Sequence, residues 1–213
     1  MAPPAPPLAV PAALPGRLVR LVPLAPSHLE PLLAAANEDA AEPFPFTTVP
    51  RDAGAMRAYL EEALDAAARG LAVPFATLSA RDGALLGTTR FANLERWAWP
   101  DPAERRPSGL DAVEIGWTWL RRSAQRSGAN TEAKRLMLAH AFEAWQVRRV
   151  TLKTDARNAR SRAAIARLGA SLDGLLRGHL PASDGGPRVS AVFSILDSEW
   201  PAVRARLDGL LAR

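Results

Sequence analysis

The stretch from Val113 to Thr154 constrains the fold more than any other part of this sequence. Residues Val113 to Leu120 alternate, with Val113, Ile115, Trp117 and Trp119 on one predicted face, which indicates a β-strand. A glycine-containing turn follows, and apolar residues at helical spacing then predict a helix that opens near Asn130. Residues Arg149 to Thr154 alternate again. A strand, a helix and a second strand in immediate succession predict a right-handed parallel crossover.

The turn between this strand and helix, residues Gln125 to Asn130, is a candidate anion site. The first N–H groups of a helix lack internal partners, and the helix dipole places partial positive charge there. We therefore expect a phosphate at this turn. The alternative is a turn that only joins a strand to a helix.

The remaining elements alternate between the two periodicities, and no internal repeat is present. Strands are expected at 18–22, 73–79, 85–94, 172–180 and 188–195, and helices at 27–36, 53–69, 158–168 and from 198 onward. Ser27 and Asp52 are placed to cap the first two helices, and Gly169 to end the third. These elements predict one α/β domain of the α+β type, residues 16–213, with a mixed, mostly antiparallel sheet of about seven strands. Residues 1–15 contain six prolines and are expected to form a flexible tail outside the fold.

Composition excludes several kinds of site. The chain has 213 residues and no cysteine, which rules out a thiol nucleophile and thiolate metal ligands. Its three histidines are far apart in the sequence, so no metal is expected. The 27 Lys and Arg residues, only two of them lysines, exceed the 22 Asp and Glu but do not cluster as in a nucleic-acid-binding segment. Without a membrane-spanning run or a signal peptide, a cytoplasmic protein is expected.

Several segments occur in an order typical of one enzyme family. They are Glu114-Ile-Gly-Trp, Gly128-Ala-Asn-Thr-Glu-Ala-Lys, Leu152-Lys-Thr-Asp, Asn158-Ala-Arg-Ser, Arg167-Leu-Gly-Ala, Phe193-Ser-Ile and Glu199-Trp. With them the chain resembles the GNAT N-acetyltransferases, in particular the RimJ/RimL-like branch. The resemblance implies acetyl-CoA as cosubstrate, bound in a V-shaped splay between strands 113–120 and 149–154. It also implies an amine acceptor, either a protein N-terminus or a small amine, and a possible homodimer.

The resemblance assigns the acetyl-CoA site to residues of the turn and its neighbours. The turn residues that would hold the pyrophosphate through their amides are Gln125, Arg126, Ser127, Gly128, Ala129, Asn130 and Thr131. Asn130 departs from the family's usual glycine or alanine, but asparagine tolerates unusual backbone angles and is a good N-cap. Trp117 and Thr118 would contact the thioester end, and Asn158 the pantetheine arm. Capping of a helix is the alternative role of Asn158. Nearby arginines at 121, 122, 126 and 160 can reach the phosphates or stay solvated.

Two residues are candidates for proton transfer. Glu114 would act as the general base, directly or through water, and Ser161 as the general acid that protonates the departing thiolate. Their alternative roles are a solvated or salt-bridged strand carboxylate and a hydroxyl bonded to the backbone at a helix start. Tyr59, the single tyrosine, lies in an early helix rather than after Ser161, where many family members carry a catalytic tyrosine. A backbone N–H near Trp117 would polarise the thioester carbonyl.

The expected reaction is direct acetyl transfer to a primary amine. Residues 44–48 and 97–99, with Arg90 and His179, are candidates for the acceptor pocket, and Arg177 with His179 can bind an acidic group or form an exposed polar face. His140, beside apolar residues on a helix, is expected to be structural. Two rival functions are a non-catalytic acyl-CoA-binding regulatory protein and, with less support, a nucleic-acid-binding protein.

Overall fold

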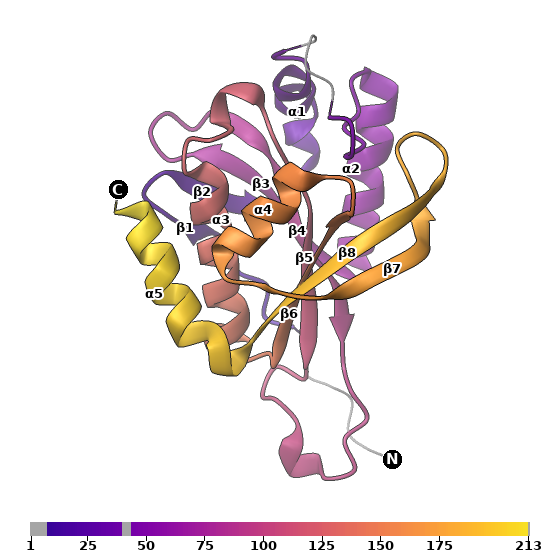
Figure 1. Ribbon diagram of the computed structural model, residues 1–213. Coiled ribbons are helices and arrows are strands. Elements are labelled where there is room, and N and C mark those ends of the chain that lie inside the picture. The colour runs from indigo at the N-terminus through magenta and orange to yellow at the C-terminus, as the bar shows by residue number, and fades with distance from the viewer. Residues whose placement is uncertain (1–7, 40–43, 213) are drawn as a thin grey trace.

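The computed structural model shows one mixed sheet with helices on both faces (Figure 1). It describes residues 8–39 and 44–212. The sheet has eight strands in the order β1-β2-β3-β4-β5-β6-β8-β7, and β5 and β6 form its parallel pair. This confirms the predicted α+β architecture and its parallel crossover, with one strand more than expected.

The first half of the chain forms the antiparallel part of the sheet and two helices. Strands β1 (Leu14–Pro15), β2 (Val19–Pro23), β3 (Ala72–Ser79) and β4 (Leu85–Glu95) pair in sequence order, and helices α1 (Leu29–Ala36) and α2 (Ala53–Ala68) lie between β2 and β3. Asp52 caps α2 as predicted, because its carboxylate accepts from the Ala55 N–H at 2.8 Å. Ser27 does not cap α1: it lies within a short 3₁₀ turn (Pro26–His28) that precedes this helix.

The second half supplies the crossover and a C-terminal hairpin. Strand β5 (Ala112–Leu120) leads through a 3₁₀ turn (Arg122–Ala124) to α3 (Ala129–Ala139), which continues as a π-helical turn (His140–Ala144) before β6 (Arg149–Asp155). Helix α4 (Ala159–Leu168), strands β7 (Ser171–Pro181) and β8 (Pro187–Leu196), and helix α5 (Trp200–Leu211) complete the chain. Short 3₁₀ turns also occur at Pro102–Glu104, in the segment that projects from the bottom of Figure 1, and at Asp197–Glu199.

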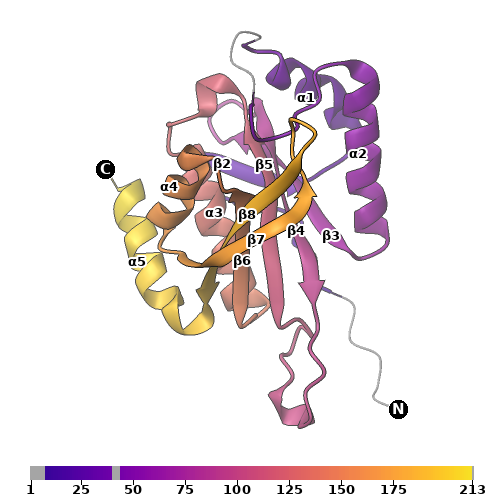
Figure 2. The same ribbon diagram turned by 45° about the vertical axis from the view of Figure 1, so that its right-hand side comes forward.

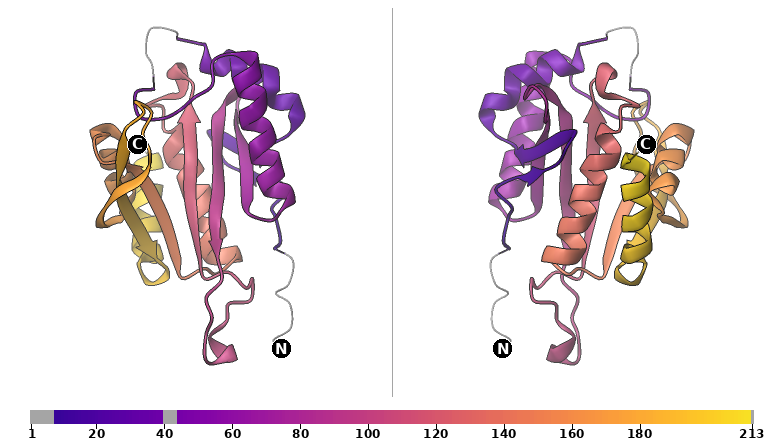
Figure 3. Two further views of the ribbon diagram at one scale, coloured as in Figure 1. Left: turned by 90° about the vertical axis from the view of Figure 1, so that its right-hand side faces the viewer. Right: turned by 90° about the vertical axis from the view of Figure 1, so that its left-hand side faces the viewer.

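Two apolar cores flank the sheet. Helices α1 and α2 cover one face near β3, where Leu32, Met56 and Leu60 are buried. Helices α3 and α5 cover the other face, where Met137, Leu138 and Leu207 belong to the larger core. Figure 3 shows the sheet edge-on with these two helical layers on opposite sides, and Figure 2 shows the β7–β8 hairpin in front of the other strands of the sheet.

A β-bulge in β5 changes the predicted face of Trp119. Thr88 pairs with Trp119 and Arg90 with Gly116, so residues 117 and 118 lie opposite Thr89 alone. Trp117 adopts a left-handed backbone with φ +48°. The extra residue reverses the alternation, and Trp119 packs in the α1–α2 core instead of with Val113 and Ile115. The prediction that all four side chains share a face was wrong for this reason.

Residues in the predicted N-terminal tail contribute to the fold. Leu14 pairs with Leu21 in the sheet, and the Trp145 indole N–H donates to the Ala9 carbonyl at 2.9 Å. The turn after β1 is anchored by the buried Glu132 of α3, whose carboxylate accepts the backbone N–H groups of residues 17, 18 and 19. Residues 8–15 were thus wrongly assigned to a tail, because their proline content conceals a short edge pairing. Residues 1–7 lie outside the described part of the chain.

Candidate functional site

A cavity of about 640 Å³ lies where β5 and β6 separate. The two strands are in register only for three residue pairs, Ala112 with Arg149, Val113 with Val150 and Glu114 with Thr151. Beyond these pairs the bulge turns β5 away from β6, and side chains from both strands, α3 and α4 line the gap. This is the V-shaped splay expected from the sequence.

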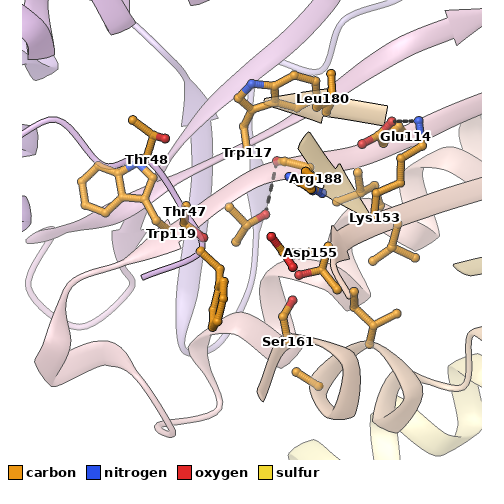
Figure 4. Close-up of a pocket in the computed structure, with 18 of the residues that line it drawn as sticks. Thr47, Thr48, Glu114, Trp117, Trp119, Lys153, Asp155, Ser161, Leu180 and Arg188 are labelled. Atoms are coloured by element: carbon orange, nitrogen blue, oxygen red, sulfur yellow. Dashed lines mark hydrogen bonds and ion pairs between the residues drawn. The ribbon is translucent and has the colours of Figure 1, made fainter. Parts of the chain in front are cut away.

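The cavity brings together five of the predicted site residues from three elements. They are Glu114, Trp117 and Thr118 of β5, Asn130 of α3 and Ser161 of α4. Figure 4 shows Glu114 beside Lys153, and Ser161 at the start of α4. The other candidates are not among the described residues that line it: Gln125, Arg126, Ser127, Gly128, Ala129, Thr131 and Asn158.

Glu114 is a buried, paired carboxylate. Its Oε2 lies 2.8 Å from the Lys153 ammonium and accepts a 2.7 Å hydrogen bond from the Asn93 amide. Glu114, Lys153 and Asn93 also line a second cavity of about 420 Å³. The carboxylate therefore lies at the boundary between two cavities on the sheet. The salt-bridged alternative describes its contacts correctly, and its position also fits a proton acceptor.

The turn before α3 contains two residues with left-handed backbones. Arg126 and Gly128 have left-handed backbones, with φ +61° and +86°. Gly128 is the N-cap of α3, so Asn130 does not use its capping ability and lies in the first helical turn. Its side-chain oxygen is buried without a hydrogen-bond partner in the described structure, although its residue lines the cavity. Arg160 of α4 donates to Gln125 at 3.4 Å, which places the start of α4 beside this turn.

Asn158 and Ser161 are linked at the start of α4. The Asn158 side chain accepts from the Ser161 N–H at 2.9 Å and caps the helix. The Ser161 hydroxyl faces the same cavity as Asp155, which is the last residue of β6. Hydrogen bonds from Arg157 hold the pKa of Asp155 below its ordinary value. Asn158 thus has the capping role that was its alternative, while Ser161 reaches the cavity.

The acceptor-side candidates divide between the two cavities and the core. Residues 46–48 and His179 line the larger cavity. Trp97 lines the smaller one, whereas Trp99 packs its loop through a 2.7 Å bond to Asp111 and stacking with Arg148. Arg90 is only 3% exposed, stacked between the rings of Tyr59 and Trp117. The backbone carbonyl of Pro45 accepts from the Ser183 hydroxyl at 2.6 Å, so the loop at 44–48 is attached to the β7–β8 turn.

His140 has the structural role predicted for it. Its ring packs against Phe91 and Trp145, and burial lowers its pKa. Arg177 is exposed on β7.

Sequence reasoning missed Lys134, Lys153 and Tyr59, all of which line the larger cavity. Lys134 donates to Thr89 and Thr118, and the Tyr59 hydroxyl lies 2.8 Å from the Thr88 hydroxyl. A signal for the lysines was present: the chain has only two, and both face this cavity. The position of Tyr59 in an early helix argued against a place in the site, but α2 packs along the sheet and its Tyr59 lines the cavity.

The described residues contain neither a metal-binding group nor a membrane-spanning helix. Within residues 8–39 and 44–212, no group of three or more His, Cys, Asp or Glu side chains could hold a metal ion. In the same residues, no helix is long and apolar enough to cross a membrane.

Comparisons with known proteins agree with this geometry. The acetyltransferase (GNAT) domain model matches residues 18–171. A GCN5-related N-acetyltransferase from Brucella melitensis is 30% identical, with a TM-score of 0.76 over 97% of this chain and 86% of its own. A probable acetyltransferase of the GNAT family from Chromobacterium violaceum is 27% identical, with a TM-score of 0.74 over 94% and 98%. Mycobacterium smegmatis RimJ, solved with CoA-disulfide, shares the fold at 24% identity and a TM-score of 0.73 over 96% and 93%. A search of curated proteins returned no match. The protein belongs to the GNAT acetyltransferase family, and it is an N-acetyltransferase.

Proposed function

We propose that this protein transfers an acetyl group directly from acetyl-CoA to a primary amine, either a protein N-terminus or a small amine. The observation that carries the proposal is the cavity between β5 and β6, which gathers Glu114, Trp117, Thr118, Asn130 and Ser161. The CoA-disulfide bound by the RimJ structure is in line with this donor.

The donor would lie with its thioester at the β5 bulge and its phosphates at the turn before α3. The backbone amides of residues 125–131 would hold the pyrophosphate, since a helix N-terminus favours an anion. The unpartnered oxygen of Asn130 fits an N–H donor, which the amides of a pantetheine arm supply. The Trp117 N–H would hydrogen-bond to the thioester carbonyl and stabilise negative charge there as the amine attacks.

The acceptor amine would approach from the side of Glu114. Glu114 takes a proton from the amine, directly or through water, and the amine nitrogen bonds to the thioester carbon. The C–S bond of the tetrahedral intermediate then breaks, and the Ser161 hydroxyl protonates the thiolate and regains a proton from solvent. An α-amino group titrates near pH 8 and a lysine near 10.4, so making the amine neutral at pH 7 costs about 1 kcal/mol for the former and about 5 for the latter. A base held in an ion pair therefore suits an acceptor of low pKa.

The test is acetyl transfer over a panel of peptides and small amines, with release of the CoA thiol as the readout. Calorimetry with CoA accompanies it. We expect CoA to bind and at least one amine to be acetylated. No heat at millimolar CoA would contradict the donor site, and CoA binding without transfer to any amine would favour a regulatory acyl-CoA-binding protein.

A further inference from the structure

Lys134 is a buried lysine that the proposed reaction does not use. It lies on α3 in the wall of the larger cavity and is 5% exposed. Its ammonium donates to the Thr118 hydroxyl at 2.5 Å and the Thr89 hydroxyl at 3.0 Å. No salt bridge joins it to an Asp or Glu in the part of the chain that the structure describes. A buried cation without a counter-ion is costly, and such groups gather at functional sites.

Charged and titratable side chains on each of the surrounding elements contact other groups. On α3, Glu132 accepts backbone N–H groups and Arg135 pairs with Asp208. On α2 and β4, Tyr59 bonds to Thr88 and Arg90 to Glu62, and on β5 and β6, Glu114 pairs with Lys153 and Asp155 with Arg157. On α4, Arg160 bonds to Gln125 and Arg162 to Ala156, and on β7 and β8, His179 lies against Ser190 and the charge of Arg188 lowers the pKa of Asp155. The direct contacts of Lys134 are thus the two threonine hydroxyls.

These hydroxyls connect Lys134 to a backbone carbonyl in the bulge. The hydroxyls of Thr118 and Thr89 lie 3.2 and 3.4 Å from the Gly116 carbonyl and 2.8 Å from each other, so one hydroxyl donates to the other, which donates to the carbonyl. A protonated lysine can only donate. It therefore occupies a lone pair of each threonine and leaves their O–H groups for each other and for the Gly116 carbonyl.

The Gly116 carbonyl and the Trp117 N–H belong to one peptide group. The group is planar and trans, so its carbonyl and its N–H point in opposite directions. Hydrogen bonds to the carbonyl fix the orientation of this peptide and increase the polarity of its N–H, because hydrogen bonds in a chain strengthen one another. Trp117 also holds a left-handed backbone that a bulky residue rarely adopts, so the peptide needs support from its surroundings.

We propose that Lys134 is a positioning residue that acts through Thr118 and Thr89 on the Gly116–Trp117 peptide, and so orients and polarises the Trp117 N–H toward the thioester carbonyl. The proposal rests on the proposed function, in which this N–H contacts that carbonyl. Lys134 itself does not contact the reacting atoms.

The proposal predicts a dependence on pH. Burial lowers the pKa of Lys134 to about 7. When the ammonium loses its proton, its nitrogen becomes an acceptor, and a threonine hydroxyl can turn away from Gly116 and donate to it. The contribution of Lys134 to kcat is therefore largest below pH 7 and decreases above it.

The experiment compares kcat and the KM for acetyl-CoA between about pH 6 and pH 9 in wild type and three variants. Lys134→Met removes the donor at similar length, Thr118→Val removes one hydroxyl, and Thr77→Val is the matched control. Thr77 is a buried threonine of the same sheet whose hydroxyl has no partner in the described structure. At low pH we expect about tenfold lower kcat for Lys134→Met, with KM changed less than about twofold, as for loss of one charged hydrogen bond. Thr118→Val should change in the same direction, and Thr77→Val should match wild type.

The ratio of wild-type to Lys134→Met kcat cancels the titration of the acceptor amine, which both enzymes share. A ratio that shrinks toward one above about pH 8 supports the proposal. A ratio constant with pH, a change confined to KM, or a Thr118→Val enzyme that equals Thr77→Val overturns it. If Lys134→Met does not fold, Lys134→Arg provides the same test. An arginine side chain stays charged across this pH range, so the decrease of kcat that loss of the Lys134 proton causes near pH 7 should be absent from this variant. A wild type that neither binds CoA nor releases thiol would instead contradict the proposed function.

Discussion

Three ionisable side chains of the larger cavity differ in how their charges are balanced. Glu114 has Lys153 as its partner and Asp155 has Arg157, whereas Lys134 has two neutral hydroxyls. Hydrogen bonds from Arg157 lower the pKa of Asp155, and burial lowers the pKa of Lys134 to about 7. The chemistry of each group follows from its partner more than from its residue type.

For Glu114→Gln we expect kcat to fall by at least a hundredfold, with little change in the KM for acetyl-CoA. The amide cannot accept a proton, and removal of a general base commonly costs a factor of this size. Steady-state kinetics across pH measure it, and the limb of the profile that reports the base should disappear. Glu95→Gln is the control, since Glu95 lines the smaller cavity without contacting Lys153. An unaltered pH profile would leave Glu114 with a structural role.

Lys134→Met should also change how stability depends on pH. The pKa of this lysine is lowered from 10.5 in the unfolded chain to about 7 in the fold. Between these values the unfolded state binds more protons, so the wild-type free energy of unfolding should rise, relative to the variant, as pH increases from about 7 to 10. Urea unfolding of both proteins across this range measures the difference. A constant difference would show that Lys134 titrates normally.

At the scale of elements, the site depends on two departures from regular structure. The β5 bulge opens the gap to β6, and Gly128 ends the preceding turn in a left-handed conformation at the start of α3. The crossover, the glycine turn and the cap of α4 were predictable because each leaves a local pattern. The bulge was not, since a bulge depends on the partner strand and Val113 to Leu120 alternate without interruption.

Gly128→Asp tests the turn before α3, with Gly128→Asn as its control. Both side chains have the same shape and tolerate a left-handed backbone, so their cost to folding should be similar. The carboxylate alone repels a pyrophosphate, and we expect the KM for acetyl-CoA to be at least tenfold higher for the aspartate than for the asparagine variant. The difference should shrink as salt is added. Equal KM values for both variants would place the phosphates elsewhere.

At the scale of the molecule, the N-terminal residues link the sheet edge to the larger core. Leu8 and Leu14 pack against this core, and Ala9 accepts from the Trp145 indole. Helix α3, which is distant in the sequence, holds the turn after β1 through hydrogen bonds to the Glu132 carboxylate. The segment that looks least structured in the sequence therefore belongs to the domain from residue 8 onward.

Deletion of residues 1–15 should lower the melting temperature by several degrees. It removes the β1 pairing and the Trp145 bond, about 2 kcal/mol together, and for a chain of this size each kcal/mol corresponds to roughly 2–4 °C. Deletion of residues 1–7, which removes none of the described contacts, is the control. Calorimetry of both truncations measures the effect. Equal melting temperatures would show that residues 8–15 do not stabilise the fold and behave as a tail.

The sequence by itself determined the order and type of the elements, the parallel crossover, and the family through its ordered motifs. The elements and the crossover follow from local periodicity, capping residues and turn chemistry, which act over a few neighbouring positions. Only the tertiary structure decided that Trp119 changes faces, that Tyr59 and Lys134 reach the cavity, and that Leu14 joins the sheet. Each of these depends on which distant segment packs against the residue. A local sequence pattern indicates that a side chain is buried, but it does not indicate which segment covers it.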